Sequence, residues 1–421
     1  MEQLFTQALG LTPPWVVASV DFRQAEGAIH FAAECRARRL PCPACGAPEQ
    51  PIHDRIERRW QHLHFFQFRA FIDARVPRVA CTACGKTGQV EVPWSRPGSG
   101  FSLVMEAFLV ALCQAMPAAH VARLVGVSDD RIWRLLRHHV DQARAREDFS
   151  DVRRLAVDET STRRGQRYVT LFHDADARRL LFATPGRDAK TFAAFAADLR
   201  AHGGDPAVIT DLGMDLSAAF QAGARQQCPQ ARISFDPFHV VALASQALDQ
   251  VRRAEVKSEP DLKGCRWALL KRAADWNREQ IDTMHWLQRS RLKTARAWRL
   301  KEALRAIYRL RPPAAEAERW FARWISWARR SRLPPFKRLA ATCRAHLPGI
   351  VEHFRSGLSN AFVEAMNAQV QAAKARAKGY ATVRNLTAIA YLLCAKLKHL
   401  PRNPWFTPAM AGSGSFHRRR D

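Results

Sequence analysis

Short apolar runs alternate with polar segments between residues 153 and 240, and this pattern predicts a mixed α/β domain. Strands are expected where β-branched and aromatic residues gather, at residues 155–157, 168–172, 178–184, 206–210 and 231–235. A helix is expected at 189–199, with Asp188 as its N-cap, and another through Ser217 and Phe220. Three strands followed by helix, strand, helix and strand is the order of a ribonuclease-H-like mixed sheet with helices on its faces.

The first of these runs ends on Asp158, before a glycine-containing turn predicted at residues 161–166. A carboxylate at the end of a buried strand is costly unless a hydrogen-bond network or a cation holds it. The alternative is an aspartate that only caps the next turn. The predicted topology sets the ends of the first and fourth strands side by side, so Asp158 would face Asp211 or Asp215. Two facing carboxylates repel each other unless a cation lies between them, and oxygen ligands suit Mg²⁺ or Mn²⁺.

Two CxxC pairs, each followed by glycine, lie in the N-terminal region that we assign to residues 1–95. Cys42 and Cys45 form the first pair, and Cys81 and Cys84 form the second. Four thiolates at this spacing predict a tetrahedral Zn²⁺ site, and four protein ligands leave no open position, so its role would be structural. A pair of redox-active or unused thiols is the alternative.

Residues 96–150 are predicted to form a helix-turn-helix domain. Ala122 is small where two helices would cross, Gly126 would make the turn, and Ile132 would return to the shared core. The second helix presents Arg131, Arg134 and Arg137 at three-residue spacing on one face. Such a face suits a DNA major groove or a phosphate ridge, whereas the alternative is an ordinary helical hairpin.

The α/β pattern stops near residue 240 and returns near residue 350. Residues 241–349 are helical, basic and rich in tryptophan, which predicts an all-α insertion between core segments 151–240 and 350–400. In the second core segment, Glu364 and Asn367 share one face of a helix expected to end at Gly379. A surface glutamate is the alternative interpretation of Glu364. Residues 401–421 form a basic tail.

The net charge of the chain indicates which class of molecule it binds. Lys and Arg number 66 against 39 Asp and Glu, which gives a net charge of +27 and favours nucleic acid as the partner. The most apolar stretch, residues 101–116, carries Glu106 and is too short to span a bilayer, so we expect no membrane association. These features indicate a cytoplasmic protein, and the family resemblance described below implies a place in the bacterial nucleoid.

Taken in order, these motifs resemble the L-three family of bacterial insertion-sequence transposases. The resemblance rests on the two cysteine knuckles, the helix-turn-helix, AVDETSTRRGQRYVT, MDLSAAF, FDPFHVV with ALDQVRR, and SNAFVEAMN with AKGY. It implies that Asp158, Asp215 and Glu364 are the catalytic acids of a DDE enzyme, with Asp215 matching better than Asp211. Asp236, His239 and Asn367 would support them. Ala365 and Gln371 depart from the family's usual glycine and basic residue, which affects DNA contacts and not the acids.

The resemblance also implies an activity. The enzyme would bind double-stranded DNA at the terminal inverted repeats of an insertion sequence, cleave there, and join the ends to target DNA with Mg²⁺ or Mn²⁺ as catalytic cofactor. A homo-oligomer is expected, because two ends must be held together. Two alternatives are a catalytically inactive DNA-binding regulator derived from a transposase, and a structure-selective nuclease that cuts without joining.

Overall fold

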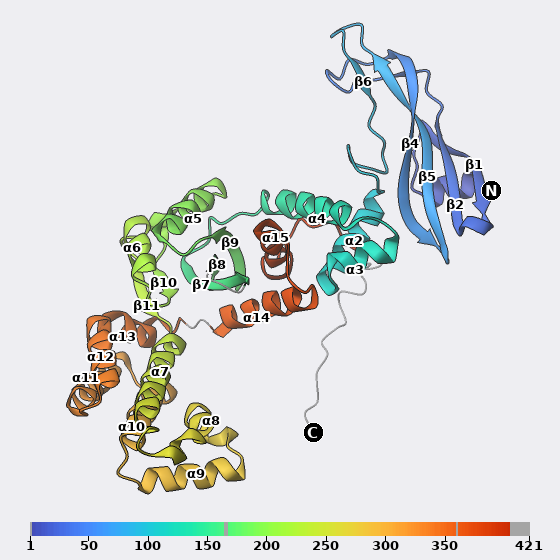
Figure 1. Cartoon of the computed structure of the whole chain (residues 1–421). Coiled ribbons are helices and arrows are strands. Elements are labelled where there is room, and N and C mark those ends of the chain that lie inside the picture. The colour runs from blue at the N-terminus through green and yellow to red at the C-terminus, as the bar shows by residue number, and fades with distance from the viewer. Residues whose placement is uncertain (1, 164–166, 359–360, 405–421) are drawn as a thin grey trace. The chain divides into compact units, whose positions relative to one another are not determined.

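The computed structural model describes residues 2–163, 167–358 and 361–404 (Figure 1). The chain divides into two compact units, Met1–Arg144 with Leu397–Asp421, and Ala145–Lys396. Each unit is described by itself. Most of the predicted basic tail, residues 405–421, lies outside the described residues, and so does the tip of the predicted turn at 164–166.

The first unit contains a twisted sheet in the order β1-β2-β5-β4-β3, with β6 paired to β5. All neighbours are antiparallel except β2 and β5. Its core includes Trp15 and Trp60, whose rings meet Trp94 edge to face at 4.9 and 5.4 Å. The strands are β1 (Trp15–Arg23), β2 (Ala28–Cys35), β3 (Arg39–Leu40), β4 (Gln50–Phe65), β5 (Phe68–Ala80) and β6 (Thr87–Gln89), preceded by helix α1 (Glu2–Ala8).

Three further helices of this unit confirm the predicted helix-turn-helix. They are α2 (Leu103–Ala115), α3 (Ala118–Val125) and α4 (Asp129–Arg144). Gly126 has φ 70° and ends α3 in the left-handed region, which a residue without a side chain adopts at little cost. Ala122 and Ile132 are buried between the helices, as their spacing predicted.

The second unit is built on a mixed sheet in the order β11-β10-β7-β8-β9. β7, β8 and β9 form an antiparallel meander, and β10 and β11 run parallel to β7. The elements are β7 (Arg154–Arg163), β8 (Arg167–Asp174), β9 (Arg179–Pro185), α5 (Ala189–Ala201), β10 (Asp211–Met214), α6 (Ala218–Gln227) and β11 (Arg232–Phe235). Asp188 caps α5 by accepting a hydrogen bond from Lys190 N, as predicted.

Two strand boundaries differ from the prediction. Residues 206–210 do not form the fourth strand, because Pro206–Val208 is a short 3-10 helix and the strand is Asp211–Met214. β7 does not stop at Asp158 but continues to Arg163, since Thr160 and Ser161 pair with Val169 and Tyr168 of β8. Asp158 therefore lies within a strand, opposite Leu171.

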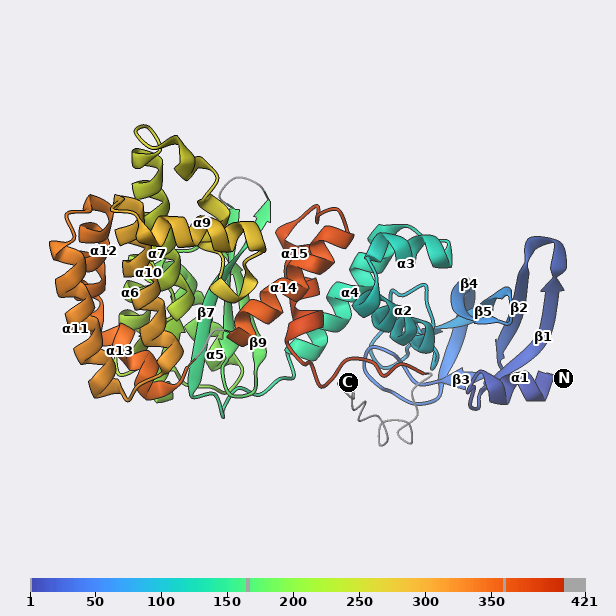
Figure 2. The ribbon, with the colours of Figure 1, turned by 90° about the horizontal axis from the view of Figure 1, so that it is seen from below.

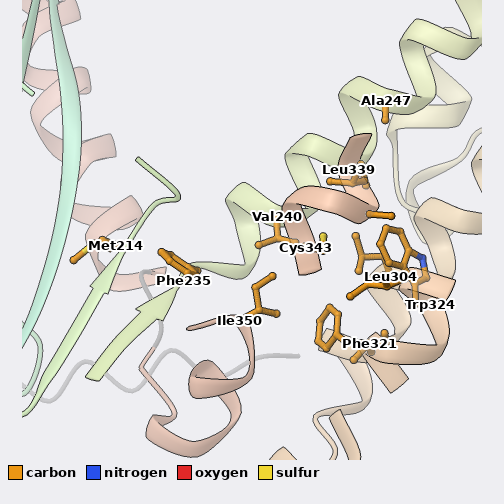
Figure 3. Packing of buried hydrophobic residues seen from close by; sticks show 14 of the residues in the cluster. Met214, Phe235, Val240, Ala247, Leu304, Phe321, Trp324, Leu339, Cys343 and Ile350 are labelled. Atoms are coloured by element: carbon orange, nitrogen blue, oxygen red, sulfur yellow. The ribbon is translucent and has the colours of Figure 1, made fainter. Parts of the chain in front are cut away.

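The segment after β11 is helical, as predicted for the insertion. Its helices are α7 (Pro237–Glu255), α8 (Arg266–Leu270), α9 (Arg278–Arg289), α10 (Lys293–Leu310), α11 (Ala314–Arg330), α12 (Pro334–Ala345) and α13 (Leu347–Ser356). One hydrophobic core runs from Met214 and Phe235 of the sheet, through Val240, to Phe321 and Trp324 (Figure 3). The insertion is thus packed onto the sheet through a shared core, although Trp267, Trp286 and Trp327 are exposed.

Two last helices, α14 (Ala361–Arg376) and α15 (Val383–Cys394), complete the second unit. α14 contacts β7 and α15 contacts β9, whereas α13 of the insertion contacts β11 at the other end of the sheet. Figure 2 shows α14 and α15 beside β7 and β9, with α11, α12 and α13 on the opposite side. Tyr391 of α15 accepts a hydrogen bond at its hydroxyl oxygen from the backbone N–H of Ala183 in β9, at 2.8 Å. Among the described residues, every helix is too short or too polar to cross a lipid bilayer.

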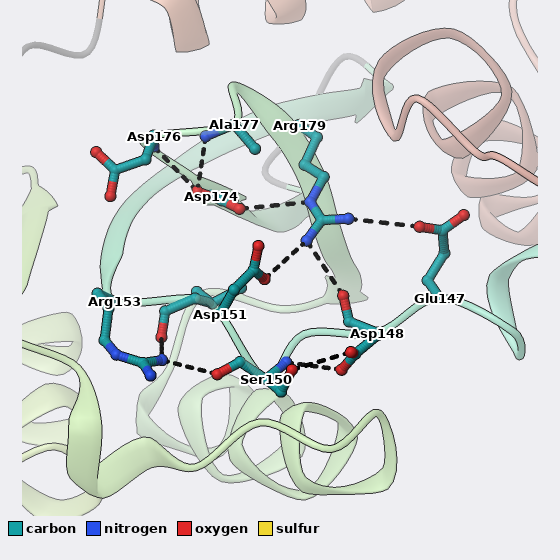
Figure 4. Close-up of polar contacts among 10 residues, drawn as sticks. Glu147, Asp148, Ser150, Asp151, Arg153, Asp174, Asp176, Ala177 and Arg179 are labelled. Carbon is teal, nitrogen blue, oxygen red and sulfur yellow. Dashed lines mark hydrogen bonds and ion pairs between the residues drawn. The ribbon is translucent and has the colours of Figure 1, made fainter.

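A buried arginine ties the start of this unit to the sheet. Arg179 of β9 is almost fully buried and lies 3.4 Å from carboxylate oxygens of Glu147, Asp151 and Asp174 (Figure 4). Asp174 also accepts hydrogen bonds from the backbone N–H groups of Asp176 and Ala177, which fixes the β8–β9 turn. The network therefore joins the entry segment to two strands.

Candidate functional site

The four predicted cysteines form one cluster in the first unit. Their Sγ atoms all lie within 4.8 Å of one another, with Cys42 3.8 Å from Cys84 and Cys45 3.6 Å from Cys81. Gly46 and Gly85 have φ 74° and 68°, so both knuckles make the same turn. Within each turn a backbone N–H points at sulfur, from Ala44 to Cys42 and from Cys84 to Cys81, both at 3.4 Å.

This donor set fits a structural Zn²⁺. A tetrahedron of thiolates with Zn–S bonds of ~2.3 Å has S–S edges of ~3.8 Å, close to the separations found here. Backbone N–H groups of Cys45 and Ala44 lower the pKa of Cys42 to about 6, which favours its thiolate. The pKa of Cys45 is raised, because the neighbouring cysteine sulfurs outweigh the opposing backbone N–H of Ala47. All ten cysteines of the chain are free, so no disulfide competes for these sulfurs.

A second group of acidic residues lies at one edge of the β7–β11 sheet. β7, β10 and β11 are parallel neighbours, so their carboxyl ends meet at the same edge. Asp215 directly follows β10 and Asp236 directly follows β11. Leu212 and Gly213 lie opposite Leu155 and Ala156, and this register continued by two residues sets Asp215 beside Asp158. Asp158 therefore lies at this edge of the sheet, although β7 continues past it to form a hairpin with β8.

Helix α14 brings residues from far along the chain to this edge. Asn367 Nδ2 donates to Asp158 Oδ2 at 2.6 Å. One turn further on, Gln371 Nε2 donates to Thr160 Oγ1 at 2.6 Å, and Lys374 Nζ donates to Ser161 O at 2.8 Å. One polar face of α14 therefore follows the second half of β7. Glu364, three residues before Asn367, lies on the same face.

The charges of this acidic cluster act on one another. Burial raises the pKa of Asp158, the nearby His239 lowers it, and Asp215 and Glu364 raise it further. Burial likewise raises the pKa of Asp236 to about 6, against the opposing effect of His239. The structure thus brings together six residues selected from the sequence: Asp158, Asp215, Asp236, His239, Glu364 and Asn367.

Asp236 and His239 lie at the start of α7. Asp236 occupies the N-cap position but its side chain makes no capping hydrogen bond. Instead, its Oδ2 lies 3.8 Å from His239 Nε2. A carboxylate that does not serve the helix, beside a histidine and two other acids, has the features of a site residue.

Asp211 lies away from this cluster. It begins β10, whereas Asp215 follows the end of the strand, and four residues of strand span about 13 Å. Asp211 forms an ion pair with Arg232 at 2.8 Å and lies 3.8 Å from Arg154. These two arginines also flank it in the strand register, so Asp211 has a local structural role.

The acidic cluster is more open than the cysteine cluster. Among the described residues, the four cysteines form the only group in which three or more possible ligand atoms lie within 4.8 Å of one another. The donor set itself consists of carboxylate oxygens, which are the ligands that Mg²⁺ and Mn²⁺ prefer.

Sequence reasoning missed one acid of this region. Burial and the charge of Asp215 raise the pKa of Glu159 to about 6. The available signal was its position directly after Asp158, but strand alternation points the two side chains to opposite faces. Only the three-dimensional arrangement brings the charge of Asp215 to bear on Glu159.

The three arginines of α4 differ in their surroundings. Arg131 lies over the ring of Phe101 with its Cζ atom 4.5 Å from the centroid, and it donates to Gly100 O at 3.4 Å. Arg134 is exposed, and Arg137 is half-buried. The shared face predicted for these arginines exists, but Arg131 also packs within its own unit.

Three models of known protein families match the chain. An ISL3 model described as "Transposase" matches residues 155–390. A model described as "Helix-turn-helix domain of transposase family ISL3" matches residues 90–140, and one described as "zinc-finger of transposase IS204/IS1001/IS1096/IS1165" matches residues 38–84.

Curated relatives cover almost the whole chain. The transposase for insertion sequence element IS1557 of Mycobacterium tuberculosis is 30% identical over 96% of this chain and 97% of its own length. The transposase for insertion sequence element IS1001 of Bordetella parapertussis is 27% identical over 82% of this chain and 86% of its own length.

Proposed function

This chain belongs to the ISL3 family of transposases, which is the L-three family named above. On that premise we propose how the protein works. It binds the terminal inverted repeats of an insertion sequence, cleaves DNA at those ends and joins them to target DNA by metal-dependent phosphoryl transfer. The family match over residues 155–390 makes it a DNA-cleaving and DNA-joining enzyme. The inactive-regulator alternative is not favoured, because the transposase model matches residues 155–390 and all three candidate acids are present.

The observation that carries the mechanism is the acidic cluster at the carboxyl edge of three parallel strands. Asp158, Asp215 and Glu364 come from separate segments, and the charges of the latter two raise the pKa of Asp158. A group of acids that repel one another is stabilised by a divalent cation. We therefore assign these three residues as the ligands of Mg²⁺ or Mn²⁺.

Bound there, two divalent cations would supply a deprotonated water or 3′-hydroxyl for attack on a phosphodiester and would stabilise the leaving 3′-oxygen. The chain itself orients the ligands. Asn367 holds Asp158 Oδ2 by a 2.6 Å hydrogen bond and so fixes the orientation of this carboxylate. Ser217 N donates to Asp215 Oδ1 at 2.9 Å and fixes the second acid. Asp236 and His239 complete the surroundings as supporting residues.

The order of the strands supports a ribonuclease-H-like core. Three antiparallel strands, β7 to β9, are followed by β10 and β11, which add in parallel on the other side of β7. That is the arrangement expected from the sequence pattern, and Asp158, which we assign as the first acid, lies on the central strand β7. The helical insertion enters after β11, before the helix that carries Glu364.

The first unit supports recognition of the DNA ends. The helix-turn-helix presents Arg134 on the exposed face of α4, beside Arg131 and Arg137, and the zinc ribbon stabilises the adjoining sheet. Neutralising DNA phosphates with these arginines fits the net charge of +27. We further propose that the enzyme acts as a homo-oligomer, which pairs two ends, on DNA of the bacterial nucleoid.

A plasmid assay tests this proposal. A supercoiled plasmid carrying the DNA that flanks the reading frame is incubated with Mg²⁺ and either the wild-type protein or Glu364→Gln. We expect wild-type protein to cut the plasmid and to form joined products, and the variant to bind the ends without cutting. Full cleavage by the variant would refute the assignment of Glu364. Cutting by wild-type protein without joined products would indicate a nuclease instead.

A further inference from the structure

The hairpin formed by β4 and β5 ends in an unusual turn. Phe65 and Phe68 are the last paired residues, and Phe66 and Gln67 form the connection. Phe66 has φ 53°, in the left-handed region, and its exposed fraction is 81%. Asn or Gly would suit this position better, because a bulky residue is strained there and an exposed aromatic ring gains nothing from burial. Such a residue at a costly position points to a function.

Neighbouring aromatic rings hold the base of this turn. The Phe65 ring lies 4.8 Å from that of Phe66, 5.8 Å from that of Phe5 and 6.5 Å from that of Phe31. Phe31 is buried in the unit's core. Phe66 therefore projects from a packed platform, so little conformational freedom would be lost when its ring meets a ligand.

The same hairpin carries an excess of positive charge. Residues 50–80 contain six arginines against three acids. Arg55, Arg58, Arg59 and Arg75 line a hollow of about 740 Å³ on this sheet. Three acids, Glu34, Glu57 and Asp73, and several alanines complete the lining, so arginines outnumber acids there by one. Arg59 is held in place by Asp73, with Nε 2.5 Å from Oδ1. Arginines along a two-stranded ribbon suit the phosphates that border a DNA groove.

We propose that the β4–β5 hairpin is a second DNA-binding element, in which Phe66 wedges against the bases while the arginines contact the backbone. A two-stranded β-ribbon fits the major groove, and proteins insert apolar side chains between base steps where they distort the duplex. DNA is the occupant that the arginines favour. This inference rests on the proposed function in one respect: the duplex that the hairpin binds is taken to be the end of the insertion sequence.

The test uses the full-length zinc-loaded protein without divalent metal, so that cleavage plays no part. The probe is a duplex from the DNA that flanks the reading frame, with 2-aminopurine at one position at a time. For wild-type protein we expect fluorescence to rise at one base step, where the wedge unstacks the probe. Phe66→Asn should abolish this rise and bind about 10-fold more weakly, because stacking on an aromatic ring contributes about 1–3 kcal/mol.

Three controls separate this role from a structural one. Asn tolerates the left-handed region, so Phe66→Asn should melt no lower than wild type, whereas a structural phenylalanine would give a lower melting temperature. Leu4→Asn removes another exposed apolar side chain of the same unit and should leave binding and fluorescence unchanged. Phe66→Trp should retain the signal.

Two results would overturn the proposal. One is wild-type affinity and fluorescence in Phe66→Asn. The other is a change only in self-association, seen by light scattering as fewer dimers with duplex binding intact, which would make the tip a contact between copies of the chain.

Discussion

Asn367 Nδ2 donates to Asp158 Oδ2 at 2.6 Å, across 209 residues of sequence. The bond joins the central strand of the sheet to the helix that carries Glu364. It also fixes the orientation of the Asp158 carboxylate. Asn367 Oδ1 is buried without a hydrogen-bond partner among the described residues, so the amide is held by this one contact.

Asn367→Ala should therefore impair catalysis through Asp158. Partners that orient metal ligands typically contribute 10–100-fold to metal affinity or activity. We expect cleavage to fall by about that factor, the Mg²⁺ concentration for half-maximal rate to rise, and end binding to stay unchanged. Gln369→Ala, an exposed position on the same helix, is the matched control. Equal Mg²⁺ dependence in the variant and wild type would contradict the orienting role.

The pKa of Asp236 predicts a pH dependence of stability. Burial raises this pKa from an ordinary 3.8 to about 6. A carboxyl with a raised folded-state pKa stabilises the fold below its unfolded pKa, and that contribution is lost as the pH rises from about 4 to 6. The free energy of unfolding of Asp236→Asn, relative to that of wild type, should therefore rise by about 2–3 kcal/mol as the pH increases from 4 to 7.

Denaturant unfolding of both proteins without divalent metal measures this difference. Mg²⁺ should reduce it at pH 7, because a bound cation stabilises the ionised carboxylates of wild type. A difference between the two proteins that stays constant from pH 4 to pH 7 would show that Asp236 is not a strained acid.

Removal of zinc should affect only the first unit. Cys81→Ser breaks the four-thiolate set, and the β4–β5–β6 end of the sheet depends on that set for its folding. We expect about one Zn²⁺ per chain in wild type, loss of that metal in the variant, and loss of end binding. Cys113→Ala, a buried cysteine outside the cluster, should retain zinc. Unchanged metal content in Cys81→Ser, by elemental analysis, would exclude this site.

Arg179→Met should destabilise the second unit. The variant leaves Glu147 and Asp174 buried without their cation, and removal of one partner of a buried ion pair typically costs about 3–5 kcal/mol. Urea unfolding, followed by circular dichroism, measures the free energy of unfolding of each protein. Arg178→Met, at an exposed neighbouring position, should change it by less than about 0.5 kcal/mol. Similar losses for both variants would mean that the buried network contributes nothing specific.

The arginines of α4 should separate into two classes. Arg134 is exposed, so Arg134→Ala should weaken end binding and reduce the slope of log affinity against log salt by about 1. Arg131 packs on Phe101, so Arg131→Ala should also lower the melting temperature of the first unit. Fluorescence anisotropy across a salt series and thermal melting distinguish the classes. An unchanged salt slope in Arg134→Ala would remove this arginine from the DNA interface.

The sequence predicted the type and order of most elements, because those depend on local pattern. The helix-turn-helix and the Asp188 cap followed from short-range chemistry. The strand at residues 211–214 was missed because DLGM has weak β propensity, and its two strand neighbours, not its composition, make it a strand. Residues 206–210 have the better composition but begin with a proline-led 3-10 turn.

The site was predictable only in part. The spacing of the cysteines identified their cluster directly, whereas Glu364 was matched to Asp158 by family resemblance, since no local pattern links residues so far apart. The strained Phe66 could not be predicted either, because its backbone angle arises from the turn geometry and not from composition.

The strand β10 offers the most direct test, because it carries one aspartate at each end. Mg²⁺-dependent cleavage of the end-bearing plasmid is measured for Asp215→Asn and for Asp211→Asn, with end binding recorded for both. The account predicts that Asp215→Asn binds but does not cleave, and that Asp211→Asn cleaves at close to the wild-type rate, since Asp211 lies at the opposite end of β10 and pairs with Arg232 and Arg154. Cleavage by Asp215→Asn at the wild-type rate would contradict it.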